Sequence, residues 1–99
     1  MITDYLSKGA ANAKTARELA KLLDCDTRGI TQIIESERRA GAPIISSNDP
    51  TTPGYYLAET AEEVQHYCRR LHQRAGEIFK TRRALLKTAQ TMPQQEPQQ

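Results

Sequence analysis

The side chains best suited to catalysis or metal binding are few in this 99-residue chain, and their spacing argues against both roles. His66 and His72 lie six residues apart in a helix-like segment, about 240° apart around the axis, so they cannot form the metal-binding pair that histidines four residues apart provide. Cys25 and Cys68 belong to no CxxC motif, and Cys25 has the character of a small buried core residue. We therefore expect surface histidines, reduced thiols, no metal, no cofactor and no enzymatic activity.

Basic side chains are the chemically active groups that the chain carries in excess, and they are unevenly distributed. Residues 1–60 hold seven basic and eight acidic side chains, a sum of −1, whereas residues 61–99 hold seven and four, a sum of +3. Between Val64 and Met92, Glu77 is the only acid beside seven cations, which gives +6: Arg69, Arg70, Arg74, Lys80, Arg82, Arg83 and Lys87. A segment of that charge density attracts polyanions or repels a second copy of itself.

Length and composition limit the chain to one small core. The mean hydropathy is −0.70, and no apolar run approaches the roughly 20 residues of a membrane-spanning helix, so we expect no membrane partner. The first six residues lack the basic and apolar regions of a secretory signal, which favours a cytoplasmic location. Residues 91–99 are mostly Gln and Pro and are expected to form a disordered tail.

The strongest local signal begins at Thr15. Thr15 and Glu18 have the spacing of a capping box, in which each side chain accepts a hydrogen bond from the backbone N–H of the other residue. The apolar residues that follow share one face of a helix: Ala16, Leu19, Ala20 and Leu23. A weaker pattern at the start of the chain, with Gly9 as its stop, predicts a short helix from the spacing of Ile2, Tyr5 and Leu6.

A further helix is predicted after the break at Asp24–Asp26. Asp26 or Thr27 can cap it, and Gly41 ends it. Gly29 lies in its first turn, where glycine either permits close approach of the backbone to a ligand or is merely tolerated. The apolar face of this helix is expected to consist of Ile30, Ile33 and Ile34.

Two short β-prone runs then predict a hairpin. Pro43–Ser47 and Tyr55–Leu57 flank the seven-residue loop Asn48–Gly54, which contains two prolines and is dense in turn formers. Thr60 and Glu63 repeat the capping-box spacing and begin a helix that runs from residue 61 to about residue 90, or about 45 Å. A helix of that length exceeds what a domain of this size can bury.

The segment Leu19–Ile34 resembles the consensus of helix-turn-helix proteins. Ala20 stands where that family has a small residue at the crossing of its two helices, and apolar residues occupy the core positions Leu23, Cys25, Ile30 and Ile33. Asp24 replaces the usual turn glycine, and Asp tolerates the left-handed conformation of the turn better than most residues. The stretch Glu35–Leu57, with an E-x-x-R-x-x-G-x-P-I opening and a G-Y-Y-L ending, is similar to small winged-helix proteins of bacteria and their prophages.

This resemblance implies a mainly α fold with a small β-hairpin. A winged helix-turn-helix domain would occupy residues 1–60, and a long basic amphipathic helix for dimerisation or partner binding would occupy residues 61–90. The helix that follows Asp26 would lie in the major groove of double-stranded DNA. Its base-contacting residues would be Thr27, Arg28, Thr31, Gln32 and Glu35.

The chemistry of these side chains suits base recognition. Arginine pairs bidentately with guanine, glutamine with adenine, and the threonine methyl meets the thymine methyl. The resemblance implies phosphate contacts from Lys14, Thr15, Arg38 and Arg39. The hairpin loop contains no Lys or Arg, so any DNA contact from it would be weak and would come from Asn48, Thr51 and Thr52.

One apolar stripe runs the length of the predicted last helix, with Val64, Leu71, Ile78, Leu85 and Met92 at intervals of seven. Its first two turns are expected to cover the domain core, which leaves the later stripe without a partner in the monomer. This predicts a homodimer formed by a short antiparallel or crossed helix pair, through Leu71, Ala75, Ile78, Phe79, Leu85 and Leu86. The open alternative is a helix that packs within its own chain and exposes a solvated basic face.

Two classes of function follow from these patterns. The first is a homodimeric protein that binds double-stranded DNA sequence-specifically, and that regulates transcription or serves a prophage process such as excision or replication initiation. The second is a protein-interaction module in which the winged helix and the long helix dock another protein. Binding to random duplex DNA at two salt concentrations would separate them.

Overall fold

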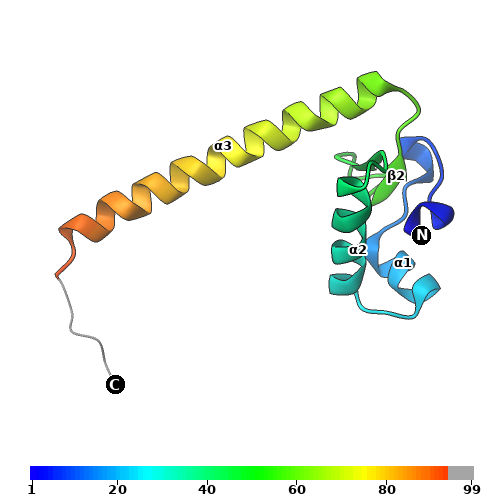
Figure 1. The fold of residues 1–99 in the computed structure, drawn as a ribbon, viewed down its shortest axis with the longest axis horizontal. Helices are drawn as coiled ribbons and strands as arrows, with labels where there is room; N and C mark the ends of the chain where they lie inside the picture. The colour runs from blue at the N-terminus through cyan, green and yellow to red at the C-terminus, as the bar shows by residue number, and fades with distance from the viewer. Residues whose placement is uncertain (94–99) are drawn as a thin grey trace. The chain divides into compact units, whose positions relative to one another are not determined.

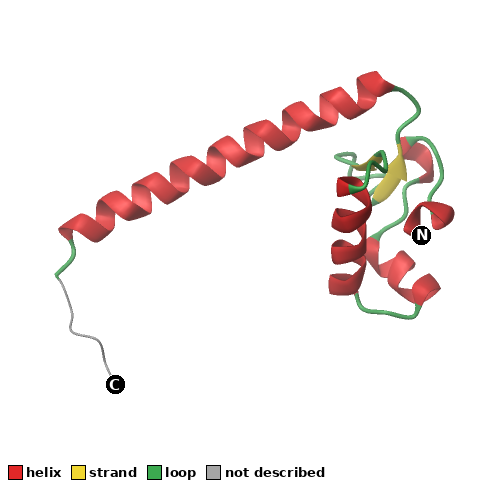
Figure 2. Cartoon of the chain, viewed as in Figure 1, coloured by secondary structure: helices red, strands yellow, loops and turns green. Residues whose placement is uncertain are grey.

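The computed structural model describes residues 1–93 and is mainly helical, with one two-stranded antiparallel hairpin (Figure 1). The predicted tail at residues 91–99 overlaps this region only at its start, where Thr91 is still helical, and residues 94–99 lie outside the described part. The chain divides into two compact units, Met1–Tyr67 and the segment from Cys68 onward. Figure 2 shows the elements by type, which in chain order are η1 (Ile2–Tyr5), η2 (Ala10–Asn12), α1 (Ala16–Leu23), α2 (Thr27–Arg39), β1 (Ile44–Ser46), β2 (Tyr55–Leu57) and α3 (Ala61–Thr91).

The predicted caps of α1 and α2 are confirmed. The Thr15 hydroxyl accepts a hydrogen bond from Glu18 N at 3.1 Å, and the Glu18 carboxylate accepts one from Thr15 N at 3.2 Å. Of the two candidate caps for α2, Asp26 is the one used, because its carboxylate accepts from Gly29 N at 2.7 Å. Asp24 has the left-handed conformation, with φ 52° and ψ 52°, so the turn between the two helices forms with aspartate in place of glycine.

The beginning of α3 also follows its predicted cap. Glu63 N donates to the Thr60 hydroxyl at 3.2 Å. The Glu63 carboxylate accepts from Glu59 N at 3.4 Å rather than from the backbone of Thr60, so the reciprocal half of the box is shifted by one residue. The helix ends at Thr91, one residue beyond the predicted end.

The core of the N-terminal unit lies where α1, α2 and β1 meet the first residues of the chain, and its buried members are Ile2, Leu6, Leu19, Ala20, Ile30, Ile34 and Ile44. The prediction that Ile33 completes this core is wrong, since Ile33 is 36% exposed. At about 100° per residue it lies about 60° from Ile30, at the edge of the buried face. The prediction of a buried Cys25 is also wrong, because this residue is exposed in the turn that follows Asp24.

Glu37 occupies the core-facing position that the apolar pattern missed. It lies seven residues after Ile30, on the same face of α2, and it is buried. Its carboxylate oxygens accept hydrogen bonds from Ile2 N at 2.6 Å and from Thr3 N at 3.2 Å. The predicted first helix is therefore a single 3-10 turn, Ile2–Tyr5, anchored on α2 through this side chain.

The segment that precedes α1 pairs with β2. Within the hairpin, β1 and β2 are antiparallel, with Ile44 opposite Leu57. On the β2 side, Gly9 N donates to Leu57 O at 3.1 Å, and the Lys14 and Tyr55 backbones exchange hydrogen bonds of 2.9 and 2.7 Å. Residues 8–14 contain no β-prone run, so this pairing was not predicted from the sequence.

The hairpin loop closes against the same segment. Gly54 has φ 115°, in the region that favours glycine, and a Cβ atom there would overlap the Lys14 carbonyl. Ser47 N donates to Gly54 O at 2.8 Å and closes the base of the loop. Only glycine fits this close approach of two backbones.

A second, smaller cluster joins the hairpin to the start of α3. Ile45, Ala58 and Tyr67 are buried in it, and Tyr56 and Val64 pack against them. The first two turns of α3 therefore pack on the N-terminal unit, as the sequence predicts. They extend this unit to Tyr67, past the predicted boundary at residue 60.

Candidate functional site

The side chains predicted to contact bases all lie on the exposed side of α2. The buried residues Ile30 and Ile34 set the rotation of this helix about its axis, because they must face α1 and the rest of the core. That rotation leaves the other side of the helix to solvent. Its exposed members include Thr27, Arg28, Thr31, Gln32, Glu35 and Arg39.

Two of these side chains keep their full hydrogen-bonding capacity. Within residues 1–93, the Arg28 guanidinium and the Gln32 amide make no hydrogen bond or ion pair. They lie four residues apart, which places them side by side on the helix surface. The Thr31 hydroxyl donates to Thr27 O at 3.1 Å, so Thr31 offers a ligand its methyl group and the acceptor capacity of its hydroxyl oxygen. This face therefore presents the guanidinium of Arg28, the amide of Gln32 and the methyl group of Thr31 within about two helical turns.

Glu35 and Arg39 form the far end of the face. Their side chains make an i, i+4 ion pair with an N–O distance of 3.8 Å, and both are largely exposed. An exposed pair of this kind is weak, about 0.3–0.5 kcal/mol, so a charged ligand can separate it. Ser36, which sequence reasoning did not single out, lines the same surface hollow as these residues, together with Thr31 and Gln32. Its place four residues after Gln32 is the signal that could have found it.

Arg38 makes hydrogen bonds and ring contacts within the protein's own structure. Its Nε donates to Ile44 O at 2.9 Å and its guanidinium also donates to the Ser46 hydroxyl at 3.0 Å. The guanidinium carbon lies 5.7 Å from the centre of the Tyr55 ring and 5.1 Å from that of the Tyr67 ring. Arg38 thus joins α2 to the hairpin and to the start of α3, a role that its position near the end of the helix did not reveal.

The two predicted phosphate contacts before α1 are likewise engaged within the chain. The Lys14 ammonium donates to Tyr5 O at 2.6 Å. The Thr15 hydroxyl both accepts from Glu18 N and donates to the Glu18 carboxylate, each at 3.1 Å. Of the predicted phosphate contacts, Arg39 alone remains exposed on the α2 face.

The hairpin loop, residues 48–54, is held in shape by Asp49. Its carboxylate accepts from Thr51 N at 2.9 Å and from the Thr51 hydroxyl at 2.8 Å. These hydrogen bonds, the backbone one above all, lower the pKa of Asp49 from its ordinary value. Thr52 is half-buried, so Asn48 is the predicted loop contact whose side chain is both exposed and free of bonds within the described chain.

The residues considered for catalysis and metal binding do not converge. His66 and His72 are exposed on α3, which confirms that they are surface residues, and Cys68 is also exposed. Among residues 1–93, no group of three or more His, Cys, Asp or Glu side chains is close enough to hold a metal ion. In the same range, no helix has the length and apolarity needed to cross a membrane.

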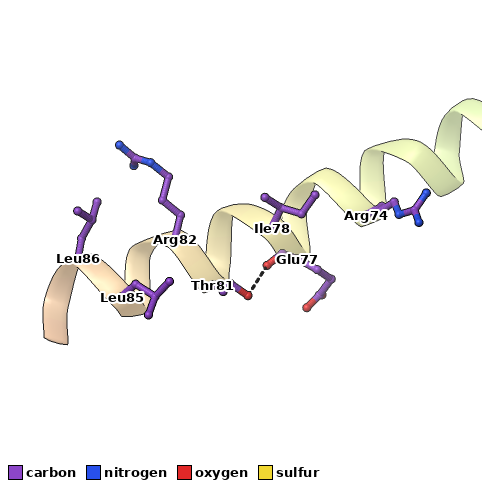
Figure 3. A pocket seen from close by; sticks show the side chains of 7 residues that line it. All are labelled: Arg74, Glu77, Ile78, Thr81, Arg82, Leu85 and Leu86. Carbon is purple, nitrogen blue, oxygen red and sulfur yellow. Dashed lines mark hydrogen bonds between the residues drawn. The ribbon is translucent and has the colours of Figure 1, made fainter. Parts of the chain in front are cut away.

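The C-terminal unit presents the predicted apolar stripe to solvent. Of the six residues predicted for a dimer interface, Ala75 is half-buried and the others are exposed, with 61% exposure at Ile78 and 65% at Leu85. A shallow surface hollow lies along the stripe (Figure 3), and all of its lining residues come from α3: Arg74, Glu77, Ile78, Thr81, Arg82, Leu85 and Leu86. The one hydrogen bond drawn there joins the Thr81 hydroxyl to Glu77 O, at 3.2 Å.

The chain was also compared with known proteins. No protein-family model matches it, and no curated protein or solved structure matches it either. Its function is therefore inferred from the arrangement of its own residues.

Proposed function

We propose that this chain is a sequence-specific double-stranded DNA-binding protein of the winged helix-turn-helix type, with α2 as its recognition helix. One observation carries the proposal: the exposed side of α2 holds Arg28 and Gln32 with unsatisfied hydrogen-bonding groups, directly after a left-handed turn at Asp24 that joins α2 to α1. A helix of about 10–12 Å diameter fits the major groove, which is about 12 Å wide. The hairpin that follows α2, whose loop is mostly exposed, supports the same assignment.

Each side chain on the proposed recognition face has a matching base or phosphate group. Arg28 would donate to guanine O6 and N7, and Gln32 would pair with adenine N6 and N7. The Thr31 methyl would meet the methyl group of thymine. Glu35 would accept from cytosine N4 when Arg39 turns from it to a phosphate oxygen. In this proposal Lys14, Thr15 and Arg38 support the fold through hydrogen bonds within the chain, and the N–H groups of Lys14 and Arg38 that these bonds leave over can still donate to phosphate oxygens.

We also propose that the protein acts as a homodimer through the apolar stripe of the C-terminal unit. The support is the exposure of large apolar side chains, which monomeric proteins rarely gather in one patch. The double change Ile78→Asp with Leu85→Asp should give a monomer in sedimentation experiments. The matched control is Gln73→Asp with Ala84→Asp, which adds the same charge to exposed positions on the side of α3 away from the stripe and should leave the dimer intact. A wild-type chain that stays monomeric at high concentration would refute the dimer.

In cells, such a dimer would regulate transcription or serve a prophage process such as excision or replication initiation, in the cytoplasm. The direct test is binding of the full chain to random duplex DNA at low and moderate salt. Phosphate neutralisation predicts detectable binding at low salt that weakens steeply as salt rises. Affinity that is undetectable at low salt, or that does not depend on salt, would rule out DNA binding.

The second candidate function is a protein-interaction module, favoured by the same exposed apolar stripe. If the stripe docks a different protein, the wild-type chain should be monomeric and should fail to bind duplex DNA at low salt. The two measurements above therefore separate the two functions without knowledge of either partner.

A further inference from the structure

A set of exposed cations lies on the side of α3 opposite the apolar stripe. At about 100° per residue, four basic side chains of the C-terminal unit fall within about 40° of the point diametrically opposite Ile78. These four residues, which we call the basic face, are Arg69, Lys80, Arg83 and Lys87, and all are exposed. Two further cations, Arg74 and Arg82, line the apolar hollow itself, so the basic face is the part of the positive charge that lies opposite the stripe.

Little negative charge opposes the basic face. From Cys68 to residue 93, Glu77 is the only acidic residue, and its carboxylate pairs with the Lys80 ammonium at 3.2 Å. Within the described residues, no ion pair engages Arg69, Arg83 or Lys87. Three cations of the face are thus open to an external anion.

The N-terminal unit cannot supply this charge. Residues 1–67 hold seven basic and ten acidic side chains, a sum of −3, whereas residues 68–93 hold seven and one, a sum of +6. Phosphate neutralisation by Lys and Arg provides most of the non-specific affinity of DNA-binding proteins. A recognition helix on a negatively charged unit therefore needs a source of positive charge elsewhere in the chain.

We propose that the basic face of the C-terminal unit binds the phosphate backbone of double-stranded DNA and supplies most of the salt-dependent affinity. This inference rests on the proposed function. In it, α2 selects the DNA sequence and the basic face binds the phosphate backbone. From Arg69 to Lys87 the face extends about 27 Å along the helix, a length that matches about eight base pairs.

The four charges of the basic face, unlike Arg74 and Arg82 beside the stripe, are placed for a phosphate backbone and not for an anionic membrane surface. A helix that lies on a bilayer inserts its apolar side, and cations that bind lipid headgroups must then lie along the flanks of that side. The basic face lies opposite the stripe, where its charges would point away from the bilayer. Contact with a phosphate backbone needs no apolar surface, so the basic face can bind DNA while the stripe packs against a second copy.

The test is the salt dependence of duplex binding by the full chain. Changing Arg69, Arg83 and Lys87 together to Gln removes three phosphate contacts, so the slope of log affinity against log salt should become shallower by about 2.7. Between 50 and 200 mM salt, the affinity ratio of wild type to variant should therefore fall about 40-fold. The preferred DNA sequence should not change.

A matched control removes the same charge from the N-terminal unit. Changing the exposed residues Lys8, Arg17 and Lys21 together to Gln should leave the slope within about one unit of wild type. The inference would be overturned if the wild type and the basic-face variant had equal salt slopes, or if the two variants showed equal reductions in slope. Either result would leave the proposed function in place.

Two further outcomes are distinguishable. If the wild type binds vesicles containing phosphatidylserine, and the basic-face variant loses that binding but keeps the wild-type DNA slope, the face binds membranes and the inference is wrong. If the wild type does not bind duplex DNA at low salt, the proposed function itself fails, and this inference fails with it.

Discussion

Replacing Glu37 by alanine removes the acceptor that holds the first residues of the chain onto α2. In the folded protein the Glu37 carboxylate accepts from Ile2 N at 2.6 Å and from Thr3 N at 3.2 Å, and Ile2 is 1% exposed. Because Ile2 is buried, water cannot replace the lost carboxylate as acceptor for its amide, and this loss should lower the free energy of unfolding by about 1.5–3 kcal/mol. The Thr3 amide is half-buried, and its longer bond contributes less, about 0.5–1 kcal/mol.

Part of this loss is offset, because alanine favours the helix slightly and removes a buried carboxylate. We therefore expect Glu37→Ala to lower the free energy of unfolding by about 2–3 kcal/mol. In a unit of this size that change should lower the melting temperature by about 10–20 °C. Glu37→Gln keeps one acceptor oxygen for Ile2 N and should lose about half as much.

The assay is urea unfolding followed by circular dichroism, together with amide exchange at Ile2 and Thr3. The matched control is Glu35→Ala, which removes the same group from an exposed position on the same helix and should change stability by less than about 0.5 kcal/mol. If the Glu37 and Glu35 variants unfold at the same urea concentration, the two amides are satisfied in another way, and the anchoring role of Glu37 is refuted.

Two further changes test other parts of the fold. Gly54→Ala should destabilise the N-terminal unit by about 3 kcal/mol or more in thermal unfolding, because the added Cβ would overlap the Lys14 carbonyl at a positive φ. Gly76→Ala has open space around its Cβ and should stabilise α3 by about 0.5–1 kcal/mol. Equal effects of the two changes on stability would contradict the close backbone approach at Gly54. The pKa of Asp49 is lowered in the folded protein, so the unfolded chain binds the proton more readily. The contribution of the Asp49 carboxylate to folding stability is therefore complete above about pH 3.9 and is lost as the pH falls through the pKa of the folded protein. NMR titration of the Thr51 amide should therefore show a midpoint below about pH 3.9, and a midpoint above that value would disprove the hydrogen-bonded loop.

Local signals in the sequence predicted most of the helical elements. Capping at Thr15 and at Thr60 depends on residues three positions away, and the left-handed turn depends on Asp24 itself, so neighbouring residues are enough to predict these features. The approximate ends of α3 and the exposure of its apolar stripe follow equally well from periodicity. For the same reason, the exposed face of α2 could be predicted before its contacts were known.

The features that escaped prediction depend on residues far apart in the chain. Glu37 faces the core because its carboxylate meets two amides about 35 positions away, which an apolar pattern cannot show. The hydrogen bond of Arg38 to the hairpin and its contact with the Tyr67 ring join residues up to 29 positions apart, so its position near the end of a helix could not reveal them. The pairing of residues 8–14 with β2 uses backbone groups alone and leaves no mark on side-chain composition.

The central claim is that α2 selects the DNA sequence. The most direct measurement is a selected-site binding experiment that compares the full wild-type chain with the double variant Arg28→Ala, Gln32→Ala, and with Arg17→Ala, Gln65→Ala as a control of the same composition at exposed positions on other helices. We predict that the wild type and the control select the same sequence, and that the α2 variant loses preference at the contacted base pairs, by about 1–3 kcal/mol for each bidentate contact. An unchanged preference in the α2 variant would contradict the account.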